Sequence, residues 1–212
     1  MMKQIAVGVV PIVIPHELDA KVRRLAAEYP MPPLPDLPRP RTVLDVGCGP
    51  GAFLAYAAQI FDWPWMIGVD AHPMMIAMAK ENAPPGTLFL QQAISSTETG
   101  EASLLVRETE RVSVPIMHPK LLPPAACLRV NIQGPEVEAL REYRHWPAVG
   151  LLFVDWHTEH ASHECAGMLR EVGLRRISAL QHRVDRATEV WARTRCQFDA
   201  RQNRYTLPEA ST

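Results

Sequence analysis

The sequence predicts an α/β protein whose mostly parallel sheet is covered by helices on both faces. From residue 42 onward, short apolar runs alternate with amphipathic segments, which is the pattern of strands joined by crossover helices. A glycine-rich turn links the first apolar run to the first helical segment, and the last two apolar runs follow each other without a helix between them. We therefore expect a parallel sheet that ends in an antiparallel hairpin.

The individual elements follow from apolar runs and from the positions of proline and glycine. Apolar runs predict strands at 42–46, 65–69, 88–91, 127–132, 149–155, 174–180 and 189–198. Helical spacing predicts helices at 51–61, 73–82, 135–143 and 159–172. Pro73 suits the first turn of its helix, and Gly173 suits the end of the last one. The stretch 95–124 gives only one possible strand, at 102–107.

Residues 1–40 form a separate N-terminal segment ahead of this pattern. The run 4–14 is rich in Val and Ile and predicts a strand, while 16–29 has apolar residues at helical spacing. Six prolines between Pro30 and Pro40 exclude a helix and predict a stiff, extended strap. We therefore place the ligand-binding domain at 41–212.

Composition indicates an ordinary globular protein. Of the 212 residues, 47% are hydrophobic and 21% are charged, and 22 basic against 23 acidic side chains leave a net charge of −1. A protein that mainly binds nucleic acid needs a strong basic excess, so nucleic acid is not the expected partner. The four cysteines show no C-x-x-C pair, and no run reaches the about 18 apolar residues of a membrane span. We expect a cytoplasmic protein without a membrane anchor.

The segment 43–52, V-L-D-V-G-C-G-P-G-A, is the strongest local pattern. Glycines 47, 49 and 51 allow a sharp turn and let a ligand lie against bare backbone, while the following helix offers free N–H groups. Such a loop binds a nucleotide-like ligand. Two interpretations compete, because Gly47-x-Gly49-x-x-Ala52 also fits the dinucleotide fingerprint.

The loop resembles motif I of the class I S-adenosylmethionine (SAM) methyltransferases, an acidic residue followed by x-G-x-G-x-G. A carboxylate at Asp45 suits the amino and sulfonium side of SAM better than it suits a pyrophosphate. The resemblance implies that SAM is the cofactor and that Asp45, Gly47, Gly49 and Gly51 hold it. It also implies a Rossmann-like class I methyltransferase fold with strand order 3-2-1-4-5-7-6 and strand seven antiparallel.

Asp70 follows the second predicted strand, where a carboxylate can accept hydrogen bonds from both ribose hydroxyls of an adenosine. Its alternative role is to cap the helix that starts at Pro73. The resemblance further implies that Ala71 lies over the adenine and that Gln92 and Ala93 border it, since an amide can contact the exocyclic amine.

A narrower resemblance covers about two thirds of the chain, from residue 43 to 180. The segment 128–136, L-R-V-N-I-Q-G-P-E, and the acid-x-His ending of 154–157 are similar to those of FkbM-type methyltransferases. Asn131 stands where that family usually has aspartate. An amide can position a hydroxyl but cannot take a proton or bind a hard metal well, so we assign no metal site.

His157 and Asn131 are the candidate catalytic residues, because the ends of strands four and five face the methyl group in this fold. A near-neutral imidazole can accept a hydroxyl proton, although His157 can equally be a polar residue that opens a helix. Glu136 can orient the substrate or favour the helix dipole, and the second interpretation is preferred. The resulting prediction is SAM-dependent O-methylation of a small-molecule or sugar hydroxyl.

Three alternatives stay open at this point. The chain can be a SAM-binding module without turnover, which the Asn131 departure favours. It can be a methyltransferase that acts on RNA or protein through the arginine-rich stretch 175–204, which holds eight arginines. A dinucleotide-dependent oxidoreductase is the third.

Overall fold

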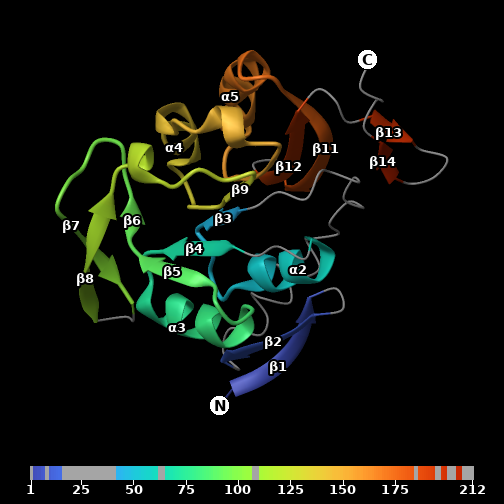
Figure 1. The fold of residues 1–212 in the computed structure, drawn as a ribbon. Helices are drawn as coiled ribbons and strands as arrows, with labels where there is room; N and C mark the ends of the chain where they lie inside the picture. Colours follow the sequence, from blue (N-terminus) through green and yellow to red (C-terminus); the bar gives the residue numbers. More distant parts are fainter. Residues whose placement is uncertain are drawn as a thin grey trace.

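The computed structural model describes residues 2–7, 10–15, 42–61, 65–106, 110–183, 186–193, 197–199 and 204–206. Its centre is a seven-stranded sheet in the order β11-β12-β10-β9-β3-β4-β5 (Figure 1). The strands are β3 (Val43–Val46), β4 (Met66–Asp70), β5 (Leu88–Gln91), β9 (Cys127–Val130), β10 (Leu151–Trp156), β11 (Leu174–Arg183) and β12 (Arg186–Arg193).

The topology confirms the predicted strand order. When the strands of this sheet are counted along the chain, their spatial order is 3-2-1-4-5-7-6. β3, β4, β5, β9 and β10 pair in parallel, whereas β12 runs antiparallel to both β10 and β11. The carboxyl ends of the parallel strands therefore share one edge of the sheet, which is where ligands bind in folds of this kind.

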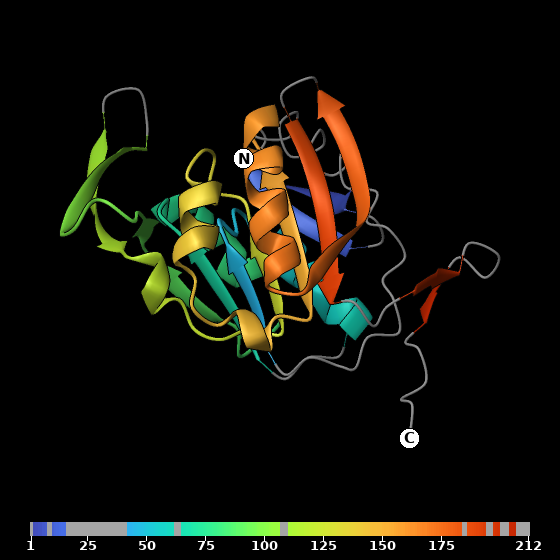
Figure 2. The ribbon, with the colours of Figure 1, turned by 90° about the horizontal axis from the view of Figure 1, so that it is seen from above.

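Helices cover both faces of the sheet, as predicted. α2 (Ala52–Phe61) and α3 (Pro73–Asn82) pack on one face, while α4 (Glu136–Glu142) and α5 (Glu159–Glu171) lie side by side on the other (Figure 2). Side chains cap two of them: His72 Nδ1 accepts the Met74 N–H group at the start of α3, and Thr158 accepts that of Ala161 in α5. Two short 3-10 turns, η2 (Pro119–Leu121) and η3 (Trp146–Ala148), precede β9 and β10.

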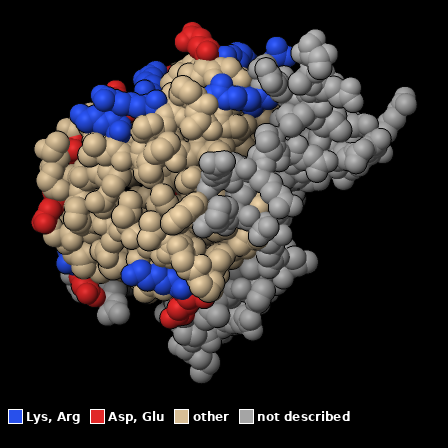
Figure 3. All heavy atoms as spheres, in the orientation of Figure 1, with Lys and Arg blue, Asp and Glu red and all other residues tan. Residues whose placement is uncertain are grey.

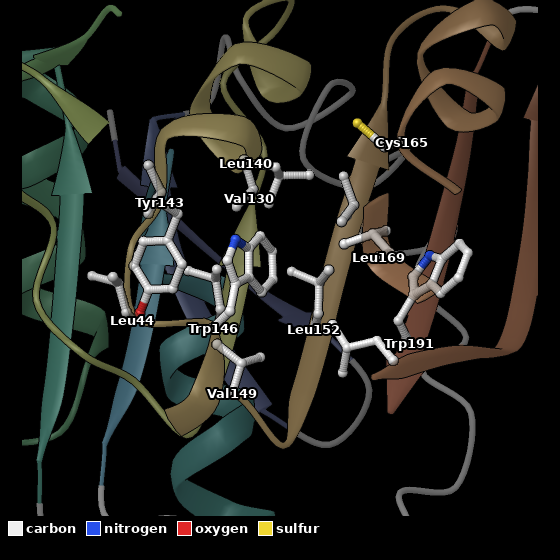
Figure 4. Packing of buried hydrophobic residues seen from close by; sticks show 14 of the residues in the cluster. Leu44, Val130, Leu140, Tyr143, Trp146, Val149, Leu152, Cys165, Leu169 and Trp191 are labelled. Carbon is white, nitrogen blue, oxygen red and sulfur yellow. The ribbon is translucent and has the colours of Figure 1, made fainter. Parts of the chain in front are cut away.

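The central strands are buried on both faces, because helices cover both. Every residue of β3, β9 and β10 is buried. On the side of α4 and α5, a cluster of buried hydrophobic side chains packs these strands against both helices, η3 and β12. Figure 4 shows part of it, including Leu44, Val130, Leu140, Tyr143, Trp146, Leu152, Leu169 and Trp191.

One buried carboxylate organises the reversed strand β12. Glu189 Oε2 accepts hydrogen bonds from the indole N–H groups of Trp156, at 2.8 Å, and Trp191, at 3.0 Å. Its Oε1 accepts the Ser162 hydroxyl at 2.9 Å and pairs with Arg176 at 2.6 Å. Glu189 therefore ties β10, α5 and β11 to β12 through charge-assisted hydrogen bonds.

A small second sheet stands between β5 and β9, where the sequence predicted only one strand at 102–107. It contains β6 (Ala93–Ile94), β7 (Glu101–Leu105) and β8 (Arg111–Met117) in the order β6-β8-β7, and it projects from the main sheet (Figure 2). β8 is therefore a correction to the prediction. Its residues alternate between exposed and buried or half-buried positions and form no continuous apolar run, and Pro115 is an unusual residue within a strand.

The N-terminal prediction of a single strand at 4–14 is also wrong. The structure has an antiparallel pair instead, β1 (Met2–Val7) and β2 (Val10–Pro15). The predicted helix at 16–29 and the proline strap lie outside the described residues. At the other end, β13 (Gln197–Asp199) pairs with β14 (Arg204–Thr206), and the strand predicted at 189–198 ends at Arg193. No helix in the described ranges is long and apolar enough to cross a bilayer.

Candidate cofactor and acceptor site

The glycine loop leaves β3 at the carboxyl edge of the sheet and leads into α2. Gly47, Gly49 and Gly51 all have positive φ angles, of 79°, 53° and 82°. These are left-handed conformations that glycine adopts at little cost. The Gly47 N–H group donates to the Val69 carbonyl at 2.7 Å, which places the loop beside the end of β4.

The three glycines serve different needs. A Cβ atom on Gly47 would lie 1.8 Å from the carbonyl oxygen of Asn131, and one on Gly51 would lie 3.0 Å from the Ala79 Cα. Those two glycines are therefore required by the packing of the protein itself. A Cβ atom on Gly49 would meet no atom within 4 Å. Gly49 presents bare backbone to open space, as a loop that receives a ligand must.

Asp70 lies against this loop. Its Oδ2 accepts the Gly49 N–H group and its Oδ1 accepts the His72 N–H group, both at 2.8 Å. The residue is half-buried at the end of β4. The cap of α3 is His72 rather than Asp70. The carboxylate thus joins the loop to the strand end where a ribose is expected.

The residues predicted to border the adenine surround the same strand end. Ala71 directly follows Asp70, and the Gln92 N–H group donates to the Asp70 carbonyl at 3.0 Å, so β5 delivers Gln92 and Ala93 beside it. The side-chain Oε1 of Gln92 is buried and has no hydrogen-bond partner among the described residues. A buried acceptor left unpaired is costly, and the exocyclic amine of an adenine would satisfy it.

Asp45 pairs with an arginine inside the protein. It is fully buried, and its Oδ1 lies 2.8 Å from Nη1 of Arg129 on the neighbouring strand β9. Arg129 Nη2 lies 2.9 Å from Asp155 of β10, and its guanidinium stacks 5.3 Å from the ring centre of Phe53. Asp45 therefore holds the base of the loop from inside the protein, and contact with the amino group of SAM stays a prediction.

Burial raises the pKa of the Asp45 carboxyl above its ordinary 3.8, although Arg129 acts in the opposite direction. Arg129 Nη1 also lies 3.5 Å from the Gly47 carbonyl. This buried ion cluster links the glycine loop to β10, the strand that leads to His157. Sequence reasoning missed Arg129, although an arginine inside an apolar strand is itself a signal of a buried partner.

The two candidate catalytic residues follow the neighbouring strands β9 and β10. Asn131 is half-buried, and its N–H group donates to the Val46 carbonyl at 2.8 Å, which fixes it beside the glycine loop. The His157 side chain is 17% exposed, and its Nδ1 lies 2.8 Å from Oε1 of Glu136. The structure therefore brings the loop, Asn131 and His157 to the same edge of the sheet.

Glu136 is a second residue whose role the sequence did not reveal. Instead of standing free at the start of α4, it is 1% exposed and accepts the N–H groups of Ile132, at 3.2 Å, and Gly134, at 3.0 Å. Burial alone raises its pKa, but the hydrogen bonds from His157 and from the Gly134 N–H group outweigh burial and lower the pKa below the ordinary 4.5. Glu136 is therefore an anion at neutral pH.

Basic side chains form a separate hollow far from this site. Arg170, Leu174, Arg175 and Arg176 line a volume of about 500 Å³ where α5 turns into β11. Leu174 pairs with Arg193, whose N–H group bonds Gly150 just before β10, so the hollow lies at the amino edge of the sheet. In the view of Figure 3, most of the described surface carries no charged side chain, and Lys and Arg side chains gather mainly along its upper edge. In the described ranges, no three His, Cys, Asp or Glu side chains are placed to hold a metal ion.

Residues 43–106 match the family model of a methyltransferase domain. Among solved structures, the chain resembles M. jannaschii TYW2 in complex with AdoMet, with 9% identity over 90% of this chain and 84% of that chain, and a TM-score of 0.51. An O-methyltransferase family 2 protein from Planctomyces limnophilus in complex with apigenin has 12% identity over 84% of this chain and 60% of that chain, and a TM-score of 0.49.

A precorrin-6y methyltransferase from Geobacter metallireducens has 10% identity over 83% of this chain and 87% of that chain, and a TM-score of 0.48. No curated protein matches the sequence. The fold is the Rossmann-like fold of class I SAM-dependent methyltransferases. The matched segment contains the glycine loop, Asp70 and Gln92, and the match supports SAM as the cofactor.

Proposed function

We propose that this protein is a SAM-dependent O-methyltransferase that acts on a hydroxyl group of a small molecule or sugar. The observation that carries the proposal is the imidazole of His157, held by the buried carboxylate of Glu136 at the same sheet edge as the glycine loop. A base beside a cofactor loop is what transfer to a hydroxyl requires. The FkbM-type segments of the sequence support the same assignment.

The residues around the loop fit SAM. Asp70 offers carboxylate oxygens to the ribose, Gly49 leaves open space for the ligand, and Gln92 offers a buried acceptor to the adenine amine. Bound SAM supplies a methyl group already activated by its sulfonium. The chain then has to align the nucleophile and remove its proton.

His157 and Asn131 are the residues for that task. The imidazole accepts the hydroxyl proton as the oxygen attacks, and Glu136 stabilises the imidazolium that forms. Asn131 orients the hydroxyl through its amide, which cannot itself take the proton. The departure from aspartate at Asn131 is therefore compatible with turnover, because the base is elsewhere.

A small acceptor is favoured over RNA or protein. The net charge is −1, and the arginine-lined hollow lies at the amino edge of the sheet, opposite the glycine loop. A macromolecule bound by those arginines would not be presented to the methyl group. The test is to incubate the protein with tritium-labelled SAM and, separately, a metabolite extract, total RNA and bulk protein. Label in the metabolite fraction is expected, whereas label in RNA or protein alone contradicts the proposal.

Replacing Asp70 with asparagine is expected to weaken SAM binding about 10- to 100-fold, because a charged acceptor for the ribose hydroxyls is lost. Isothermal titration with SAM and with S-adenosylhomocysteine measures the effect. The control is Glu81→Gln, an exposed carboxylate on α3, which should leave the affinity unchanged. Equal affinities for the Asp70→Asn variant and the unmodified protein would remove Asp70 from the cofactor site.

Replacing His157 with glutamine is expected to lower the turnover of the labelled metabolite about 100-fold or more, since a general base contributes that much. SAM affinity should stay the same because His157 serves the acceptor side. The matched control is His160→Gln, whose ring is 87% exposed on α5. Unchanged turnover in His157→Gln would show that another group takes the proton.

A further inference from the structure

We infer that Glu136 is a positioning residue that fixes His157 in the tautomer with the proton on Nδ1, so that Nε2 is the ring atom available to the acceptor hydroxyl. This inference rests on the proposed function, in which His157 is the base. The donors around the Glu136 carboxylate determine the tautomer, which can be measured without an acceptor.

The tautomer follows from the partners of the carboxylate. Glu136 Oε1 receives the Ile132 N–H group at 3.2 Å and the Gly134 N–H group at 3.1 Å, and Oε2 receives the latter at 3.0 Å. Backbone N–H groups only donate, so they favour an ionised carboxylate, which only accepts. His157 Nδ1, 2.8 Å from Oε1, must then be the donor. In a neutral ring this leaves Nε2 as the acceptor.

The carboxylate is held rigidly enough to impose this choice. Gln133, between the two donating amides, has a φ of 61°, and it is the only described residue other than glycine with a positive φ. Such a conformation is unfavourable for a residue with a side chain and persists where surrounding contacts impose it. Here it allows the amides on both sides of Gln133 to reach one carboxylate.

The same loop touches the cofactor loop. The Asn131 carbonyl lies so close to Gly47 that even a Cβ atom there would collide with it, and the Asn131 N–H group bonds Val46. A continuous set of contacts therefore runs from the glycine loop through residues 131–134 to Glu136 and on to His157. The base is positioned relative to the cofactor loop through this path rather than through its own strand alone.

The test is long-range ¹H–¹⁵N NMR of the His157 ring in the full-length protein at a pH where the ring is neutral. In the unmodified protein the proton is expected almost entirely on Nδ1, and in Glu136→Ala the ring is expected to populate both tautomers. Glu136→Asp should restore part of the preference. The matched control is Glu138→Ala, an exposed acid on the same helix, with no change expected.

Several outcomes would overturn the inference. A proton on Nε2 in the unmodified protein, or an unchanged tautomer in Glu136→Ala, contradicts it directly. If Glu136→Ala does not fold, the tautomer of the unmodified protein decides alone. Loss of turnover in Glu136→Ala without loss of SAM affinity is also expected, up to the roughly 10²–10⁴-fold contribution of a base. An intact Nδ1 tautomer in a protein that methylates no hydroxyl would instead refute the proposed function and leave the positioning intact.

Discussion

Replacing Gly47 with alanine is expected to destabilise the protein by at least about 3 kcal/mol. The new Cβ atom would lie 1.8 Å from the Asn131 carbonyl oxygen, which belongs to the backbone and cannot rotate away. In addition, a φ of 79° is strained for any residue with a side chain. Urea unfolding followed by circular dichroism measures the loss, and a variant that fails to fold at all would agree with it.

Gly49→Ala is the matched control in the same loop. Its φ of 53° costs about 1–2 kcal/mol for alanine, but the Cβ atom meets nothing within 4 Å. Stability should therefore fall modestly, whereas SAM affinity should fall strongly because the methyl group occupies the space beside the bare backbone. If Gly49→Ala binds SAM normally, or if Gly47→Ala is as stable as Gly49→Ala, the division of roles between the two glycines is wrong.

Replacing Arg129 with methionine is expected to cost about 3–5 kcal/mol, because two buried carboxylates lose their cation. Asp45 is fully buried and Asp155 is 8% exposed, so water can replace little of the guanidinium's contact with these carboxylates. The packing against Phe53 is lost as well. Equilibrium unfolding in urea at pH 7 measures the difference in free energy.

The matched control is Arg141→Met. Arg141 pairs with Glu164 at the surface, with 52% and 32% of the two side chains exposed, and such pairs contribute less than about 1 kcal/mol. A loss for Arg129→Met as small as that for Arg141→Met would show that the buried cluster does not support the fold.

The loss in Arg129→Met should shrink as the pH falls. The folded-state pKa of Asp45 is above 3.8, so above that pH the native state binds more protons than the unfolded state, and stability decreases as the pH rises through this window. In Arg129→Met the pKa of Asp45 is higher, because Arg129 no longer lowers it. The stability of the variant therefore keeps decreasing up to a higher pH. Unfolding at pH 5 and pH 8 measures the trend, and a larger loss at pH 5 would contradict it.

Local signals predicted the central sheet well. Helix α3 and strand β5 have the predicted ends, because Pro73 fixes the start of the helix and a short apolar run marks the strand, although β5 is an edge strand without a buried residue. The strand order followed from the family resemblance and from the absence of a helix between the last two strands. A strand buried on both faces has a strong apolar signal, and this is why β3, β9 and β10 were found.

Half-exposed strands and contacts between distant residues left no such signal. β8 alternates between exposed and buried or half-buried positions, and its pairing with β7, which overlaps the strand predicted at 102–107, forms only in the folded protein. Asp45 and Arg129 are 84 positions apart, and their contact depends on β3 and β9 being neighbours in register. Likewise, the local sequence shows Glu136 only as an acidic residue at the start of a helix. Its contact with His157 depends on the fold, which brings the two residues together.

The hydrogen bonds of the Glu189 carboxylate favour one register of β12 against β10. Because strand side chains alternate between faces, a slip of one residue would turn Glu189 and Trp191 together away from the Trp156 indole of β10 and toward the apolar cluster beneath α2. A misaligned chain would thus bury this charge without the donors that Trp156 and Ser162 supply, and burying a poorly paired charge is costly. The buried carboxylate therefore penalises a one-residue slip of the strand that reverses direction in this sheet.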